Sequence, residues 1–152
     1  MSEEAFSGEE LAAWHGFLRT HAIVTKRLDA LLRAQHGLAL TQFDALIQLR
    51  IVGGSVRMSQ LAESLLLSRS GVTGIVDGLE GEGLVKRRRD TEDGRVLWVD
   101  LTASGSKRLG EVVASHAANV RMNFLDPLTQ AQRRALRSSW KAIAERAEAI
   151  DG

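Results

Sequence analysis

Hydrophobic positions recur at helical spacing through the first quarter of the chain. Apolar residues return every three or four positions, which predicts a long helix over residues 8–35. Ser7 and Glu10 have the S-x-x-E spacing of a capping box, and Gly37 can end the helix in a left-handed conformation. A second apolar series widens the hydrophobic face: Phe17, Val24 and Leu31. We therefore expect this helix to contact a second partner.

The next apolar series predicts a helix that begins at Thr41, whose side chain can act as its N-cap. Gly53 and Gly54 are expected to end this helix. Its predicted buried stripe consists of Phe43, Leu46, Ile47 and Ile51. The segment "SVRM" that follows is too short for more than one strand of a small sheet.

Two short helices follow, separated by a brief break. Ser59 is the predicted N-cap of the first and Ser68 that of the second, which Gly83 is placed to terminate. The apolar period then changes from helical spacing to alternation over residues 85–88 and 96–101, with the turn-forming sequence "DTEDG" between them. This pattern predicts a β-hairpin with a polar tip.

The last third of the chain returns to helical spacing. Thr102 opens a helix that Pro127 is expected to break, and Thr129 with Gln132 forms a second capping-box pattern before the final helix. The apolar positions of the final helix are Leu136, Trp140, Ile143, Ala147 and Ile150. In the hairpin, Trp98 is expected to pack on the outer face against a neighbouring helix.

Composition narrows the class of protein. The 152 residues are 44% hydrophobic and 26% charged, as expected of a soluble globular domain. The chain has no cysteine, which excludes disulfides and thiol-based redox sensing. It has no apolar run of about 18 residues, and its acidic start lacks the features of a signal peptide. We therefore expect a cytoplasmic protein with no contact to membranes.

The net charge of +1 is close to neutral, but the basic residues are clustered. "VKRRRD" places Lys86 beside three arginines, and Arg95 follows soon after. Such a cluster favours a local contact with an anionic polymer. The alternative is a solvated strand in which one or two of these arginines pair with Asp90, Glu92 or Asp93.

The order of the elements has a functional meaning. Two short helices and a basic hairpin form a winged helix-turn-helix, whose second helix lies in the major groove of DNA. The sequence thus predicts a mainly α protein with a small β-hairpin wing. Ser59 and Ser68 would place helix N-termini near phosphates. Ser70, Thr73 and Asp77 can form hydrogen bonds with base edges.

The chain also resembles the MarR family of bacterial transcriptional regulators over residues 38–105. The similar stretches are "LTQFDAL", "MSQLAESLLLSRSGVTGIVDGLEGEGLVKRRRD", "TEDGRV" and "LWVDLTASG". The resemblance implies a homodimer in which residues 1–37 and 102–152 form the dimerisation helices. Residues 38–101 would form the DNA-binding lobe, and the whole chain one integrated domain.

The resemblance also implies roles for single residues. Arg95 would enter the minor groove, Asp93 would brace the wing through an ion pair to an arginine, and Ser70 and Thr73 would face the major groove. Gly74 and Gly78 stand where relatives often carry arginine, so contacts with DNA would depend more on Arg69 and on the wing. Gly94 also stands where relatives often carry an arginine. The full predicted DNA-binding set is Ser59, Ser68, Arg69, Ser70, Thr73, Gly74, Asp77, Arg87, Arg88, Arg89 and Arg95.

Four glycines in the second short helix form a strip. Gly71, Gly74, Gly78 and Gly81 are spaced by 3, 4 and 3 residues. At 100° per residue they fall within an arc of about 80°, beside the predicted reading face. Each interior glycine weakens a helix by roughly 1 kcal/mol relative to alanine. We interpret the strip as a surface that allows close approach of DNA or of another helix.

A ligand site is a further expectation from the family resemblance, which implies small aromatic acids as effectors. Trp14, His15 and Arg19 could stack on and pair with such an anion, and Arg50 could join them. The alternative is that Trp14 belongs to the core, while His15 and Arg19 lie at the surface. The four histidines lack metal-binding spacing, so no metal site and no cofactor are expected.

Together these patterns predict a homodimeric, sequence-specific DNA-binding regulator. We expect a repressor of a pseudo-palindromic operator that a small molecule releases. The alternative is a winged-helix module that binds an acidic protein, favoured by the glycines at 74 and 78. An enzyme is a distant third possibility, because "SGSK", Ser104 to Lys107, matches only one motif of penicillin-recognising enzymes.

Overall fold

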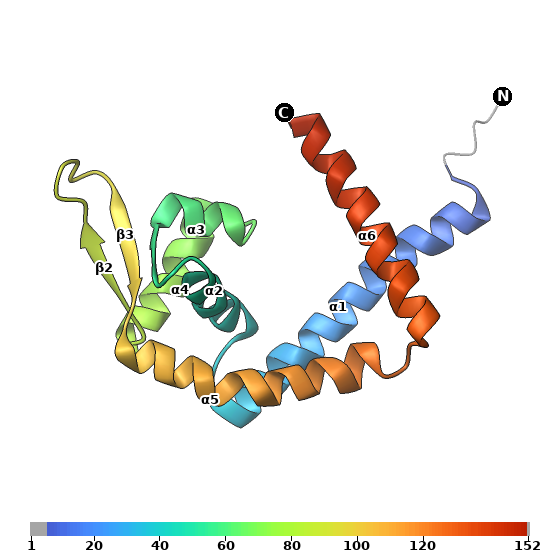
Figure 1. The fold of residues 1–152 in the computed structure, drawn as a ribbon, viewed down its shortest axis with the longest axis horizontal. Coiled ribbons are helices and arrows are strands. Elements are labelled where there is room, and N and C mark those ends of the chain that lie inside the picture. Colours follow the sequence, from blue (N-terminus) through green and yellow to red (C-terminus); the bar gives the residue numbers. More distant parts are fainter. Residues whose placement is uncertain (1–5, 152) are drawn as a thin grey trace. The chain divides into compact units, whose positions relative to one another are not determined.

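The structure is a computed structural model that describes residues 6–151. It confirms a mainly α fold with a small β-hairpin wing (Figure 1). In chain order the elements are α1 (Gly8–His36), α2 (Leu40–Ile51), β1 (Ser55–Arg57), α3 (Met58–Ser64), α4 (Arg69–Gly81), β2 (Val85–Arg89), β3 (Leu97–Leu101), α5 (Ala103–Val120), the π-helical segment η1 (Arg121–Leu125) and α6 (Gln130–Asp151).

The chain divides into two compact units after His116. The first contains α1 to β3 and most of α5, and the second contains the end of α5, η1 and α6. The division lies inside α5, whereas the sequence placed a boundary at Thr102. The reason is that Leu109 and Val112 of α5 are fully buried in the core of the first unit. A dimerisation role for the terminal helices stays a prediction.

One hydrophobic core holds the first unit together. It forms where α2, α3 and α4 pack on one another and on the inner face of the sheet, and α1 adds Leu32 to it. Burying a side chain of this size contributes about 1.5–3 kcal/mol. The fully buried large side chains are Leu32, Leu38, Leu46, Leu49, Leu61, Leu79, Leu109, Val72, Val76, Val85, Val99 and Val112.

The sheet is antiparallel, with strand order β1-β3-β2. Val99 of β3 pairs with Val56 on one side and Arg87 on the other, and its side chain enters the core. Because successive residues of a strand point to opposite faces, Trp98 lies on the outer face, between its partners Arg57 and Arg88. The β2–β3 hairpin projects from the helices of this unit with its connecting loop at the tip (Figure 1).

Several predicted helix ends are confirmed. Ser7 and Glu10 form a reciprocal capping box at the start of α1, and Gly37 ends that helix with φ +64°. Ser68 is the N-cap of α4, where its hydroxyl accepts the N–H of Gly71. Gly83, two residues beyond the end of α4, has φ +73°.

Two predicted N-caps are wrong. Thr41 lies inside α2, because the helix begins one residue earlier and its first N–H groups are bound elsewhere. The N–H of Ala39 donates to Gln42, and that of Leu40 donates to Asp29 of α1. Ser59 lies inside α3, because β1 continues directly into this helix and leaves Arg57 as the last extended residue.

Ile51 was predicted to be buried, but it is 70% exposed. The buried stripe of α2 includes Leu46 and Leu49, and Ile51 lies about 140° around the helix from Leu46. The helix ends at this residue, so no further turn covers it.

The break between α3 and α4 has an unusual backbone. Leu66 has φ +54° and is the one described residue other than glycine with positive φ. Its side chain is 91% exposed, so packing does not compensate for the cost of this conformation. The turn of the helix-turn-helix is therefore held by its flanking hydrogen bonds, including that from the Leu67 N–H to the Ala62 carbonyl.

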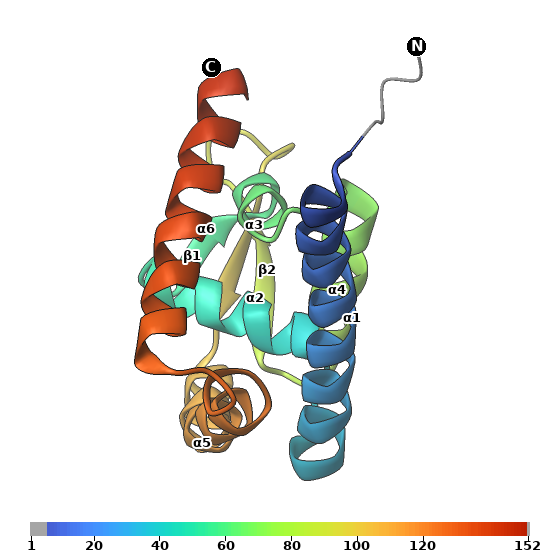
Figure 2. The ribbon, with the colours of Figure 1, turned by 90° about the vertical axis from the view of Figure 1, so that its right-hand side faces the viewer.

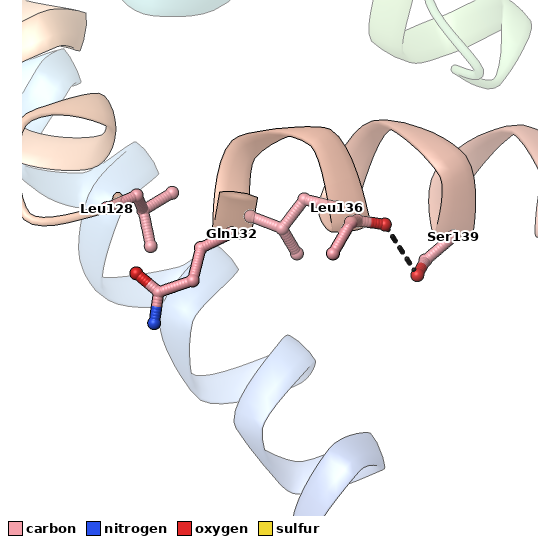
Figure 3. Close-up of a pocket in the computed structure, with 5 residues that line it drawn as sticks. Leu128, Gln132, Leu136 and Ser139 are labelled. Atoms are coloured by element: carbon pink, nitrogen blue, oxygen red, sulfur yellow. Dashed lines mark hydrogen bonds between the residues drawn. The ribbon is translucent and has the colours of Figure 1, made fainter. Parts of the chain in front are cut away.

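The regular elements of the second unit are all helices. The helical backbone continues through η1 to Leu125, and the chain turns at Pro127 as predicted. Thr129 and Gln132 form the expected capping box at the start of α6, which Figure 2 shows as one continuous helix. A shallow hollow of about 300 Å³ lies on this unit (Figure 3), and its lining residues are Leu128, Gln132, Ala135, Leu136 and Ser139.

Of the helices in the described part of the chain, none is long and apolar enough to span a membrane.

Candidate nucleic-acid interface

The exposed face of α4 carries short polar side chains. Ser68, Arg69 and Ser70 are all exposed at its N-terminus, and the hydroxyls of Ser68 and Ser70 lie 3.2 Å apart. Thr73, one turn further on, donates its hydroxyl to the Arg69 carbonyl at 2.8 Å and keeps its methyl group for other contacts. The structure thus brings the predicted reading residues of this helix together on one surface, where Arg69 is the single long side chain among them.

The glycine strip of α4 has two kinds of position. A Cβ at Gly74 or Gly81 would meet nothing within 4 Å, so the backbone is bare to solvent there. A Cβ at Gly78 would lie 2.9 Å from the Gln42 side-chain nitrogen, and one at Gly71 would lie 3.2 Å from the Ser68 hydroxyl. Only Gly74 and Gly81 are therefore available for close approach of a partner.

We predict that Gly74→Ala stabilises the isolated protein yet weakens DNA binding. Alanine should raise the free energy of unfolding by about 1 kcal/mol, because a solvent-exposed glycine inside a helix is unfavourable. The added methyl group should hold the α4 backbone away from the groove floor. Thermal unfolding and a duplex titration measure the two effects.

Gly110→Ala is the matched control. Gly110 is also a helical glycine whose Cβ would meet open space, but it lies on α5. This control should show the same stabilisation with unchanged DNA affinity. If Gly74→Ala binds DNA as tightly as the control does, the strip is not an approach surface.

Arg87 does not project toward solvent as the other wing arginines do. Its guanidinium contacts Asp77 at 2.7 Å and Glu80 at 2.9 Å, and its side chain is 29% exposed. The second oxygen of Glu80 accepts the Arg87 backbone N–H at 2.7 Å. This backbone bond, followed by the guanidinium bond, lowers the pKa of Glu80. Arg87, through Asp77 and Glu80, links strand β2 to helix α4, and the DNA contacts expected of Arg87 and Asp77 stay predictions.

Arg88 belongs to a polar network on the outer face of the sheet. It donates to Asp100 at 2.6 Å and to the Ser55 hydroxyl at 3.2 Å. Its guanidinium also lies 5.0 Å from the centre of the Trp98 ring, and that of Arg57 lies 5.5 Å from it. Trp98 therefore packs against two arginines, and the prediction of a neighbouring helix is wrong.

The alternative that one or two arginines of the cluster pair with Asp90, Glu92 or Asp93 is wrong for Arg87 and Arg88. Their ion-pair partners are Asp77, Glu80 and Asp100. The reason is the register of the hairpin, which places Lys86 opposite Asp100 and Arg88 opposite Trp98, while the inward face of β2 meets α4.

Asp90 organises the tip of the wing. One carboxylate oxygen accepts the Trp98 indole N–H at 2.8 Å, and the other accepts the backbone N–H groups of Glu92 and Asp93. These bonds, the indole bond first, lower the pKa of Asp90 to about 2. The carboxylate is therefore ionised at any pH at which the protein would bind DNA.

Two arginines complete the tip. Arg89 donates to the Gly94 carbonyl at 2.7 Å, which ties the strand to the loop. Arg95 lies 3.4 Å from the Asp93 carboxylate, which also accepts the Arg95 backbone N–H at 3.0 Å. The Arg95 side chain is 94% exposed, against 46% for Arg88. Among Arg87, Arg88 and Arg95, the side chain of Arg95 is thus the most exposed.

The residues expected at a ligand site lie on two helices. Trp14, His15 and Arg19 are exposed on α1, and Arg50 is exposed in the last turn of α2, so a shared ligand site stays a prediction. Trp14 is 49% exposed and stacks with Phe17, so its interpretation as a core residue is wrong. Within residues 6–151, no group of three acidic or histidine side chains is arranged to hold a metal ion. Ser104 and Lys107 are exposed in the first turn of α5.

The roles of three residues of this surface were not predicted from the sequence. Glu80 and Asp100 are partners of arginines, and Trp98 is the hydrogen-bond donor to Asp90. Glu80 follows Asp77 by three residues, so the two carboxylates share a helix face, which was a usable signal. Asp100 could be found only with the hairpin register, because its partner lies 12 positions away on another strand.

Comparisons with known proteins agree with this architecture. The sequence model of the MarR family matches residues 36–96. YkoM of Bacillus subtilis, an HTH-type transcriptional regulator, is 32% identical over 90 residues, which make up 59% of this chain and 58% of YkoM. The chain thus aligns with little more than half the length of that relative.

Solved structures extend the similarity to nearly the whole chain. AbsC, a MarR family transcriptional regulator from Streptomyces coelicolor, superposes with a TM-score of 0.84 at 29% identity, over 95% of this chain and 97% of AbsC. Sco3205, a MarR family regulator from the same organism solved in complex with DNA, gives a TM-score of 0.86 at 26% identity, over 95% of this chain and 91% of Sco3205. In helix order, wing and motifs, the chain is similar to the MarR family of transcriptional regulators, whose sequence model matches its DNA-binding lobe.

Proposed function

We propose that the protein binds a specific DNA operator as a homodimer and represses transcription from it. The observation that carries this proposal is the pairing of two features on the first unit: the short polar face of α4 and a wing whose Arg95 is 94% exposed. A helix with short side chains suits the major groove, and an extended arginine suits the narrow minor groove.

The contacts that we assign to DNA are fewer than the sequence suggested. Arg69, Ser70 and Thr73 read or approach the major groove, and the backbone at Gly74 comes close to it. Arg95 enters the minor groove from the wing. Arg87 and Arg88 support this surface from behind, because both already have carboxylate partners. Truncating Arg87 would remove the guanidinium partner of Asp77 and Glu80, and truncating Arg88 would remove that of Asp100.

The dimer is supported by apolar surface on the terminal helices. On α1, Leu11, Trp14 and Leu18 are all exposed and follow one another at helical steps. On α6, Trp140, Ile143 and Ile150 are exposed, and with Leu136 and Ala147 they are spaced by 4, 3, 4 and 3 residues. This spacing is that of a coiled-coil seam, which needs a second helix to cover it. A second copy of the chain supplies that cover with two-fold symmetry.

Release by a small aromatic acid is the last part of the proposal. It rests on the family resemblance and on four exposed residues of α1 and α2: Trp14, His15, Arg19 and Arg50. Trp14 and Arg19 lie on α1, whose exposed apolar residues belong to the proposed dimer surface. A ligand there would contact that surface rather than the DNA-binding face.

A winged-helix module for an acidic protein partner is the second candidate. Gly74 and Gly78 favour it, because α4 has no long basic side chain at either position with which to bind phosphates. Such a module would bind DNA weakly and with the same affinity for all sequences.

Selection of bound duplexes from a random DNA pool distinguishes the two candidates. We expect a pseudo-palindrome whose half-sites are about one helical turn, roughly 10 base pairs, apart. A pool that stays random after repeated rounds would contradict the proposal and support the protein-binding module. Repeating the selected binding reaction with small aromatic acids tests release.

A further inference from the structure

A chain of polar contacts runs from the outer face of the sheet to the tip of the wing. It begins at Asp100 on β3, which accepts hydrogen bonds from Ser55 on β1 and from Arg88 on β2. The three strands are thereby tied together on the face that lies away from the core. Arg88, held in this way, lies over the ring of Trp98.

Trp98 connects this network to the loop. Arg57 and Arg88, its partners on the two neighbouring strands, both place their guanidinium groups within 5.5 Å of its ring centre. At these distances the cation–π attraction of the two guanidinium groups restrains the ring. Its indole N–H points along the strand to Asp90 and donates to Oδ2 at 2.8 Å.

Asp90 connects Trp98 to the turn at the tip of the wing. Its Oδ1 accepts the N–H of Glu92 at 2.9 Å and that of Asp93 at 3.2 Å, so one carboxylate spans the strand end and the loop. Asp93 in turn accepts the backbone N–H and the guanidinium of Arg95 through Oδ1. From Trp98 onward, each link joins residues at most eight positions apart, and the series ends at the exposed Arg95.

We propose that Trp98 is a positioning residue for DNA binding: by holding the Asp90 carboxylate, it fixes the wing-tip turn and the direction in which Arg95 extends. The inference rests on the proposed function, because it assigns the effect of Trp98 to the Arg95 contact. An arginine that is already oriented loses less conformational freedom when it binds.

The position of Trp98 separates this role from core packing. Val99, the next residue, is fully buried in the core, whereas Trp98 lies on the opposite face of the strand and is half-buried among polar groups. Replacing it therefore opens no cavity in the core. The indole combines a ring that packs against two arginines with an N–H that donates to Asp90.

Trp98→Phe is the variant that tests the inference, because it keeps an aromatic ring under the arginines and removes the N–H. In the protein without DNA, we expect faster hydrogen exchange at the Glu92 and Asp93 amides in this variant than in the wild type. Asp90→Asn keeps one oxygen for the turn but turns an amide NH2 group toward the indole N–H, so it should also raise the exchange. Unchanged exchange in Trp98→Phe would overturn the inference, whatever the DNA measurements give.

A double-mutant cycle with Arg95→Ala tests the consequence for binding. Trp98→Phe should weaken binding to the selected duplex by about tenfold in the wild-type background and by less than about twofold in the Arg95→Ala background. Equal losses in both backgrounds would show that Trp98 acts by another route and would overturn the positioning role. A wild-type protein that binds no duplex selectively would overturn the proposed function itself, and the exchange measurement keeps the two failures apart.

Discussion

Replacing Arg95 with alanine should weaken binding to the selected operator by about tenfold to a hundredfold, as expected for loss of one arginine contact per half-site. The side chain is 94% exposed and lies at the tip of a wing that hydrogen bonds hold in place. Because it supports nothing in the core, the variant should unfold at the temperature of the wild type. A fluorescence-anisotropy titration measures the affinity, and thermal unfolding measures the stability.

Lys107→Ala is the control for charge. Lys107 is also exposed and basic and belongs to the same unit, but it lies at the start of α5. It should leave the affinity almost unchanged, because exposed charges beyond a Debye length of about 8 Å are screened at physiological salt. If the two variants lose affinity equally, Arg95 contributes only general charge and makes no specific contact.

Gly105→Ala should destabilise the protein by about 3 kcal/mol or more, a loss typical of severe overpacking. A Cβ at this position would lie 2.0 Å from the Leu84 carbonyl oxygen and 2.8 Å from a methyl carbon of Leu101. Neither group can withdraw easily, because the Leu84 carbonyl accepts the Thr102 N–H and lies at the base of the wing. Chemical denaturation measures the loss.

The control is again Gly110→Ala, which makes the same substitution five residues later in the same helix. Its Cβ would meet open space, so it should stabilise the protein by about 1 kcal/mol. The two substitutions should therefore have opposite signs. A Gly105→Ala variant as stable as the wild type would mean that α5 does not dock tightly on the base of the wing.

The sequence predicted the elements well where local signals suffice. The capping boxes at Ser7 and Thr129 depend on residues three positions apart, and both form as expected. Thr41 fails as a cap because Asp29, on another helix, binds the N–H group at the start of α2. No local pattern contains that information, since the partner lies 11 positions away in the chain.

The candidate site shows the same limit. The basic cluster and the exposed Arg95 follow from the sequence, but the partners of Arg87 and Arg88 depend on strand register and on which face of β2 meets α4. The glycine strip was predicted as one surface, yet Gly78 faces Gln42 of α2 while Gly74 faces solvent. Gly105 had no recognisable signal, because a close backbone approach is a property of tertiary packing.

The central claim is sequence-specific DNA binding, and one comparison tests it most directly. The affinity of the wild-type protein for the selected duplex is measured beside its affinity for a scrambled duplex of the same composition, at physiological salt. The account predicts a preference of at least about a thousandfold for the selected duplex. Equal affinity for the two duplexes would contradict it.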